Sequence, residues 1–116
     1  MLSFSKSRRL LSREEYDRVF KNAYKLTTPE FTVLFCDNKH ERARLGLVIS
    51  KKMIHKAHDR NKIKRVLRES FRLNTNIPAV DVVVLARSSA TQAEPSRARS
   101  NLDKLWNTLS VRHASS

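Results

Sequence analysis

A helix near the N-terminus is the first element that the hydrophobic pattern predicts. Its apolar positions, three or four residues apart, are Tyr16, Val19, Phe20 and Ala23. This spacing is typical of one face of a helix. Ser12 and Glu15 fit a capping box at its start. Leu11 can pack onto Tyr16 in front of the cap, so we expect the helix to begin directly after Ser12.

Four stretches that follow this helix predict β-strands. They span residues 24–28, 29–36, 44–50 and 80–86. The first has the weakest pattern, whereas the last is almost wholly apolar, as in a strand that is buried on both faces. In the second, aromatic and β-branched residues alternate, which places Phe35 on one face of the strand and Leu34 on the other.

A second amphipathic helix is predicted between the third and fourth strands. On a helical wheel its apolar stripe consists of Ile63, Val66, Leu67, Ser70 and Phe71. The opposite side carries Asn61, Lys64, Arg65, Arg68 and Arg72. Asp59 can cap its N-terminus, although the helix can also begin a turn earlier, near Lys56. We expect the apolar stripe to anchor the helix while the other side turns a row of cations outward.

Positive charge is concentrated on this part of the chain. The 116 residues have a net charge of +13, and residues 51–72 alone contain nine basic and two acidic residues. Neighbouring like charges on a helix repel by about 0.2–0.5 kcal/mol per pair, so a merely solvated face would favour mixed charges. A row of cations suits a phosphate backbone, because each neutralised phosphate releases counterions. A membrane surface suits it less, since the core needs the apolar stripe that would have to insert.

The remaining pattern predicts one more helix and a single domain. The apolar residues of this last helix are Ala98, Leu102, Leu105, Trp106 and Leu109. A turn-rich loop is expected over residues 88–96, and residues 112–116 are expected to form a loose C-terminal tail. The length and the 40% hydrophobic content suit one domain over residues 1–116. The order of elements predicts an α+β fold in which helices pack on one sheet.

Several kinds of protein and site are disfavoured by the sequence. No apolar stretch is long enough for a transmembrane helix, and no secretory signal is recognisable. Cys36 is the single cysteine, which suits a reducing cytoplasm and a small buried role in its apolar strand. One cysteine and scattered histidines do not supply a metal site. His55 and His58 lie close enough in sequence to suggest acid–base cleavage of RNA, but exposed RNA contacts are the simpler interpretation.

The basic segment resembles the signature of the bacterial ribonuclease P protein component. That signature has an Arg-Asn-Arg core, a preceding Lys-Lys pair, and the following dipeptides Lys-Arg and Arg-Glu. The matching residues here are Lys51-Lys52, Arg60-Asn61-Lys62, Lys64-Arg65 and Arg68-Glu69. Other stretches that resemble the family, in its order, are RLLSREEYDRVF, RLGLVISKK, VDVVVLAR and LDKLW. Lys62 departs from the final arginine, because it keeps the charge but loses the planar fork.

The resemblance implies both a fold and a function. The fold is an α-β-β-β-α-β-α sandwich with a mostly antiparallel central sheet and a left-handed βαβ crossover, as in the second domain of ribosomal protein S5. The function is that of the protein subunit of ribonuclease P, a cytoplasmic monomer that binds one catalytic RNA and precursor tRNA. The RNA would use Mg²⁺ to hydrolyse one phosphodiester and remove the 5′ leader. Catalytic residues and metal ligands are therefore expected on the RNA and not on this chain.

Site residues also follow from the resemblance. The positions expected to contact RNA are Lys51, Lys52, Arg60, Asn61, Lys62, Lys64, Arg65, Arg68 and Arg72. Tyr16 and Phe20 match aromatic positions of a cleft that holds the leader, and Leu34 lies near a family position that can be aromatic. Aromatic platforms beside cations suit single-stranded RNA. The helical spacing of Tyr16 and Phe20 is equally typical of plain core packing.

Two other functions fit the charge and the size. A structural RNA-binding protein of ribosomal type would share both, but it would not need an open, partly apolar cleft. A DNA-binding module would use the basic helix for recognition, yet such a helix usually follows another helix after a short turn. Here its neighbours are predicted strands. A preference for RNA over duplex DNA and protection of a tRNA leader would separate the three.

Overall fold

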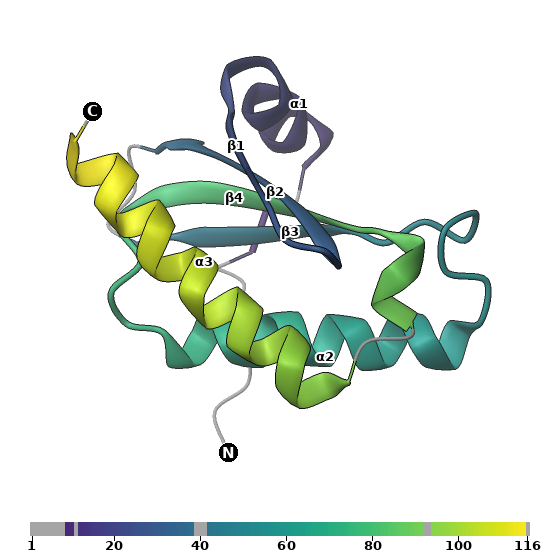
Figure 1. Cartoon of the computed structure of the whole chain (residues 1–116). Helices are drawn as coiled ribbons and strands as arrows, with labels where there is room; N and C mark the ends of the chain where they lie inside the picture. Colours follow the sequence, from purple (N-terminus) through teal and green to yellow (C-terminus); the bar gives the residue numbers. More distant parts are fainter. Residues whose placement is uncertain (1–8, 11, 39–41, 92–93, 116) are drawn as a thin grey trace.

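The computed structural model describes residues 9–10, 12–38, 42–91 and 94–115. Its elements are α1 (Arg13–Asn22), β1 (Tyr24–Thr27), β2 (Phe31–Asp37), β3 (Arg44–Val48), α2 (Ala57–Leu73), β4 (Val80–Ala86), the 3-10 helix η2 (Ser88–Thr91) and α3 (Pro95–Ser115). All four predicted strands form, including the weakly supported first one. The α-β-β-β-α-β-α order is therefore confirmed (Figure 1).

The four strands form one mixed sheet in the order β1-β2-β4-β3. β1 pairs with β2, and β2 with β4, in antiparallel fashion, whereas β3 and β4 are parallel. Parallel neighbours need a crossover, and α2 supplies it between β3 and β4. This β3–α2–β4 connection is the βαβ unit whose left-handed sense the family resemblance implies.

One face of the sheet carries the main core, under α2 and α3 (Figure 1). Trp106 of α3 is fully buried there, and its ring meets Phe71 of α2 edge to face, with the centroids 5.7 Å apart. The indole Nε1 donates a hydrogen bond to Ser70 Oγ at 2.9 Å, and the Ser70 hydroxyl donates one to Asp103 Oδ1 at 3.1 Å. The apolar stripe predicted for α2 is thus confirmed, with Ser70 acting as a polar bridge to α3.

The other face of the sheet carries α1 and a smaller apolar cluster. The buried members of this cluster are Leu10, Val19, Cys36 and Val83. Val83 belongs to it, while Val82 and Val84 belong to the main core, so alternate residues of β4 serve opposite faces. This alternation explains the almost wholly apolar sequence of β4.

The structure confirms the predicted start of α1 and, for α2, the earlier of the two predicted starts. Ser12 and Glu15 form the predicted capping box of α1, while the predicted packing of Leu11 lies outside the described residues. α2 begins a turn before Asp59, with Lys56 at the N-cap. Asp59 therefore does not cap the helix but lies in its first turn, where a carboxylate still complements the helix dipole.

The C-terminal third is more regular than the sequence suggests. The loop expected after β4 contains η2. A loose tail was expected over residues 112–116, but residues 112–115 continue α3 as far as Ser115, and Ser116 lies outside the described residues. Two interactions explain the extension: basic residues suit the last turn of a helix, and His113 Nε2 lies 2.5 Å from Asp37 Oδ1 at the end of β2.

Candidate nucleic-acid interface

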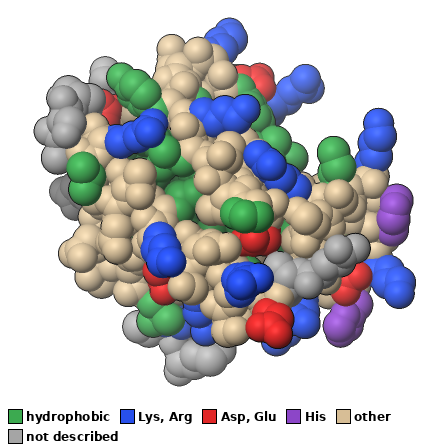
Figure 2. All heavy atoms as spheres, in the orientation of Figure 1, with side chains coloured by type: hydrophobic (Ala, Val, Ile, Leu, Met, Phe, Trp, Pro, Cys, Tyr) green, Lys and Arg blue, Asp and Glu red, His purple; other side chains and the backbone are tan. Residues whose placement is uncertain are grey.

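The outer side of α2 presents the predicted row of cations to solvent. Ile63, Leu67, Ser70 and Phe71 are buried against the sheet and α3, which turns Asn61, Arg65 and Arg68 outward. Lys51 and Lys52 are exposed in the turn that follows β3, and Lys64 and Arg72 are partly buried at the margins of α2. Figure 2 shows Lys, Arg and His side chains gathered where β3 ends and α2 begins. We call Lys51, Lys52, Asn61, Arg65 and Arg68 the basic surface.

The single acidic residue that interrupts this row in the sequence is held aside in the structure. Glu69 Oε2 accepts a hydrogen bond from Arg99 Nη2 of α3 at 2.8 Å. Arg99 thereby neutralises the carboxylate and draws it toward α3. Within the described part of the chain, no ion pair involves Arg65 or Arg68, so their guanidinium groups remain available to an anionic partner.

The three residues of the signature core point in three directions. Arg60 turns back, and its Nη1 donates to the carbonyl oxygens of Ile54 and His55, each at 2.9 Å. Ile54 is fully buried, so Arg60 fastens the turn before α2 onto the helix. This structural role was not predicted, although the position of Arg60 three residues before Ile63 was a signal for it. Asn61 is exposed on the basic surface.

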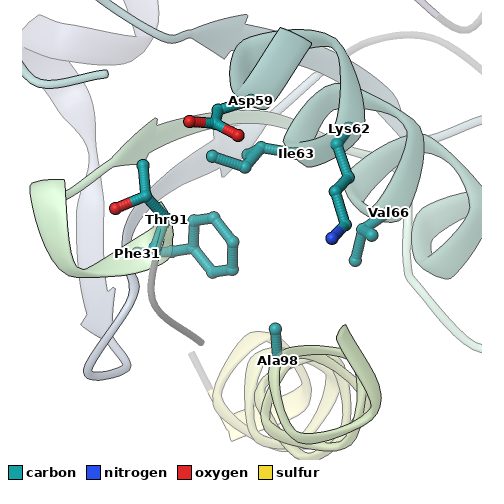
Figure 3. A pocket seen from close by; sticks show the side chains of 8 residues that line it. Phe31, Asp59, Lys62, Ile63, Val66, Thr91 and Ala98 are labelled. Atoms are coloured by element: carbon teal, nitrogen blue, oxygen red, sulfur yellow. The ribbon is translucent and has the colours of Figure 1, made fainter. Parts of the chain in front are cut away.

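Lys62 borders a small hollow and does not join the row of Arg65 and Arg68. The hollow has a volume of about 50 Å³ and lies between α2, η2 and α3. It is lined by Phe31, Asp59, Lys62, Ile63, Val66, Ala90, Thr91 and Ala98. Figure 3 shows the ammonium group of Lys62 directed toward the space between α2 and α3. The replacement of an arginine by Lys62 therefore affects the margin of the basic surface more than its centre.

Two of the three residues predicted for the leader cleft come together on the opposite face of the sheet. Tyr16 of α1 and Leu34 of β2 both pack against the smaller apolar cluster and remain partly exposed. Phe20, one turn beyond Tyr16, is 46% exposed, which excludes plain core packing for this ring. A half-exposed aromatic on the helix that packs against this face is a suitable platform for an unpaired base.

Strand pairing adds further partly exposed residues to this face of the sheet that sequence reasoning missed. Leu34 is opposite Lys25 of β1, and Thr32 is opposite Leu85 of β4. Leu85 is in turn opposite Val48 of β3. Alternation places all of these on the face that carries α1, and none of them is fully buried. We call Tyr16, Phe20, Thr32, Leu34, Val48 and Leu85 the cleft surface. The polar–apolar alternation of the strands was the signal that could have identified it.

Gly46 of β3 lets α1 approach the sheet closely. A Cβ atom at this position would lie 2.6 Å from Cε1 and 2.7 Å from Cζ of Tyr16. The Tyr16 ring therefore rests directly on the backbone of β3. The single glycine of the chain is required for this contact and not for a turn, since no glycine has a positive φ.

A buried polar network fastens α1 to the sheet beside this contact. Asp81 of β4 is fully buried, and Arg44 of β3 binds it through two hydrogen bonds, Nε to Oδ1 at 2.9 Å and Nη2 to Oδ2 at 2.8 Å. Arg44 Nη1 also donates to Glu15 Oε2 of α1 at 2.5 Å. Arg18 of α1 donates to Asp81 Oδ2, and Asn38 Nδ2 donates to Oδ1 at 2.9 Å. The hydrogen bonds with Asp81 raise the pKa of Arg44, which keeps the guanidinium charged.

This geometry agrees with the comparisons with known proteins. A family model described as Ribonuclease P matches residues 4–110. The chain belongs to the ribonuclease P protein family. It is 51% identical to the ribonuclease P protein component of Legionella pneumophila strain Corby over 109 residues, which cover 94% of this chain and 95% of that protein.

Solved structures of ribonuclease P proteins share the fold. The protein from Staphylococcus aureus superposes with a TM-score of 0.82 at 31% identity, over 89% of this chain and 95% of that one. The protein from Thermotoga maritima superposes with a TM-score of 0.75 at 34% identity, over 84% of this chain and 94% of that one. The mixed sheet with α2 as its crossover is therefore the fold of the ribonuclease P protein family.

Groups that could perform chemistry are scattered over this ribonuclease P family member. His55 and His58 are both exposed, and the nearest acid to His58 is its neighbour Asp59, with Nδ1 and Oδ1 3.7 Å apart. Cys36 is buried, and burial raises the pKa of its thiol, so it is a packing residue at pH 7. The described residues contain no cluster of three or more metal-ligating side chains and no helix able to cross a membrane.

Proposed function

We propose that this chain is the protein subunit of a ribonuclease P ribonucleoprotein that removes the 5′ leader from precursor tRNA. The basic surface would bind the catalytic RNA through its phosphates, and the cleft surface would hold the single-stranded leader. The observation that carries the proposal is the separation of these two surfaces. α2 lies on one face of the sheet and α1 on the other (Figure 1). The cations of α2 are exposed on its outer side, and Phe20 of α1 is half-exposed.

The two surfaces call for two kinds of RNA contact. Guanidinium groups at Arg65 and Arg68 suit bidentate binding of phosphate, which depends on the shape of a folded RNA and little on its sequence. The partly apolar cleft suits unpaired bases, which can stack on Phe20 while Lys25 attracts their phosphates. A protein that grips a folded RNA with one face and a single strand with the other can align the two.

We assign the hydrolysis itself to the RNA subunit and its Mg²⁺ ions. Such ions would supply an activated water molecule and stabilise the leaving oxygen of the phosphodiester. This chain would bind and orient, since its exposed cations neutralise phosphates and His55 and His58 remain peripheral RNA contacts. We further propose a monomeric free protein, a complex with one RNA, and a cytoplasmic location, as the resemblance implies.

A cleavage assay on precursor tRNA tests the proposal. The chain alone, a bacterial ribonuclease P RNA alone, and both together are compared in moderate Mg²⁺ at near-physiological salt. Cleavage at the mature 5′ end that is strong only with both components is expected. A double variant with His55→Ala and His58→Ala should cleave as the natural chain does. A chain that neither assists the RNA nor binds it would refute the proposal and leave a structural RNA-binding protein of ribosomal type.

A further inference from the structure

α1 carries the aromatic residues of the cleft surface, yet little apolar packing fixes its position. Val19 is the only fully buried residue among the described residues of this ten-residue helix. By comparison, Ala98, Leu102, Leu105, Trp106 and Leu109 are all buried on α3. A helix with so few buried contacts has little local stability from packing alone. Its position must therefore depend on other interactions with the sheet.

The polar network supplies those interactions at the point where the position of α1 matters most. Glu15 precedes Tyr16 on α1, and Arg44 lies two residues before Gly46 on β3, hence on the same face of the strand. Arg44 thus binds Glu15 beside the place where the Tyr16 ring rests on Gly46. A movement of Glu15 would carry Tyr16 with it, and Phe20 one turn further along.

We propose that Arg44 is a positioning residue for the RNA leader. By joining Glu15 of α1 to the buried Asp81 of β4, it sets where the aromatic rings of α1 meet the strip of open sheet. Arg44 itself is nearly buried, with 11% of its side chain exposed, so it acts through α1 and does not contact the RNA. This inference rests on the proposed function, because it assumes that the cleft surface holds the leader.

Glu15→Gln is the most informative substitution. Glutamine can still complete the capping box, so α1 should form as before. The change removes the negative charge that Arg44 binds. It also makes the protein more cationic, which by electrostatics alone would strengthen RNA binding. A loss of leader binding therefore cannot come from net charge.

Two further variants separate positioning from general damage. Arg44→Lys keeps a cation but cannot bridge two carboxylates through a planar fork, so it should reproduce the effect of Glu15→Gln. Asp17→Asn is the matched control, because it removes the same charge from the exposed side of the same helix, where the carboxylate is 58% exposed. It should leave leader binding unchanged.

The experiment uses the complex with ribonuclease P RNA and two precursor tRNAs, one with a long leader and one with a single-nucleotide leader. Glu15→Gln and Arg44→Lys should weaken binding of the long-leader precursor by about fivefold or more, a typical size for coupling between sites. Binding of the short-leader precursor and of the RNA subunit should not change. Phe20→Ala reports on the cleft itself, and adding it to Glu15→Gln should cause little further loss.

The failures can be told apart. If Phe20→Ala weakens only the long-leader precursor while Glu15→Gln and Arg44→Lys bind as the natural chain does, the positioning role is refuted and the cleft stands. Equal losses for both precursors would also refute it, since they would indicate damage to the whole fold. If Phe20→Ala has no leader-dependent effect, the cleft assignment fails, and the positioning role fails with it.

Discussion

Gly46→Ala should destabilise the protein by a steric clash with one residue. The new Cβ would lie 2.6 Å from Cε1 of Tyr16, whereas carbon atoms in contact are about 3.5–4.0 Å apart. The ring must therefore move by about 1 Å. Because the clash is with the far end of a partly exposed side chain, the cost should fall near the lower end of the range of about 1–3 kcal/mol for overpacking. A fall of several degrees in Tm is expected, measured by thermal unfolding.

The same substitution should become favourable once the ring is removed. Gly46 has no positive φ, so alanine fits its backbone. In a Tyr16→Ala background it should stabilise by about 0.4–1 kcal/mol, through the lower entropy of the unfolded chain. The double-mutant cycle should then give a coupling energy of about 2 kcal/mol. Tyr16→Phe is the control, because it keeps the ring and hence the clash.

The result that would refute this reasoning is a simple one. If Gly46→Ala costs as much stability in the Tyr16→Ala background as in the natural chain, the ring is not what requires glycine. The close approach of α1 to β3 would then not explain why the chain places its single glycine in a strand.

Three other changes test separate parts of the molecule. Arg68→Ala should leave Tm unchanged, and it should reduce the slope of the log binding constant for RNA against log salt concentration by about 0.7–0.9. Arg60→Ala should instead lower Tm, because two backbone carbonyls lose their hydrogen-bond donor. Equal effects of the two substitutions on Tm would contradict this division of roles. Ser70→Ala should cost about 1–3 kcal/mol in denaturant unfolding, since a buried indole N–H loses its acceptor, and an unchanged midpoint would contradict that role. Burial raises the pKa of the Cys36 thiol, so the stability that the protonated thiol contributes is present below the unfolded pKa of about 8.5 and is lost as pH rises toward the folded value. Between about pH 8 and 10, the natural chain should therefore lose more stability than the Cys36→Ala variant. Parallel curves of stability against pH for the two proteins would contradict this.

Local periodicity was sufficient to predict most of the fold. β4 forms over the predicted residues 80–86, and the apolar stripe of α2 is buried as the helical wheel indicates. Such elements are predictable because burial repeats with the period of the strand or helix. The capping box of α1 was also predictable, because its two residues are only three positions apart in the sequence.

Features that depend on distant parts of the chain were not predictable in this way. Arg44 and Asp81 are 37 residues apart, and only the pairing of β3 with β4 brings them together. The extension of α3 depends on His113 meeting Asp37, 76 residues earlier. The one available signal was Asp81 itself, a lone carboxylate in an apolar strand that needs a buried partner.

The placement of the candidate site residues was predicted in part. The basic residues of α2 lie on the outer side, as expected, but Arg60 and Lys62 follow other directions because each is near the edge of the apolar stripe. The helical spacing of Phe20 could not show whether its ring packs in the core or is exposed for stacking, because both kinds of aromatic residue recur with the same periodicity. The exposure of this ring depends on how far α1 extends across the sheet. That is set by tertiary packing and not by the local sequence.

The double-sided burial of β4 also has a consequence for how the protein can vary. Val80, Val82 and Val84 support the side that carries α2, whereas Asp81, Val83 and Leu85 support the side that carries α1. One strand thus underlies both surfaces, with neighbouring residues assigned to different ones. A substitution at an even-numbered position therefore acts first on the packing beneath α2, and one at an odd-numbered position acts first on the packing of α1 against the sheet.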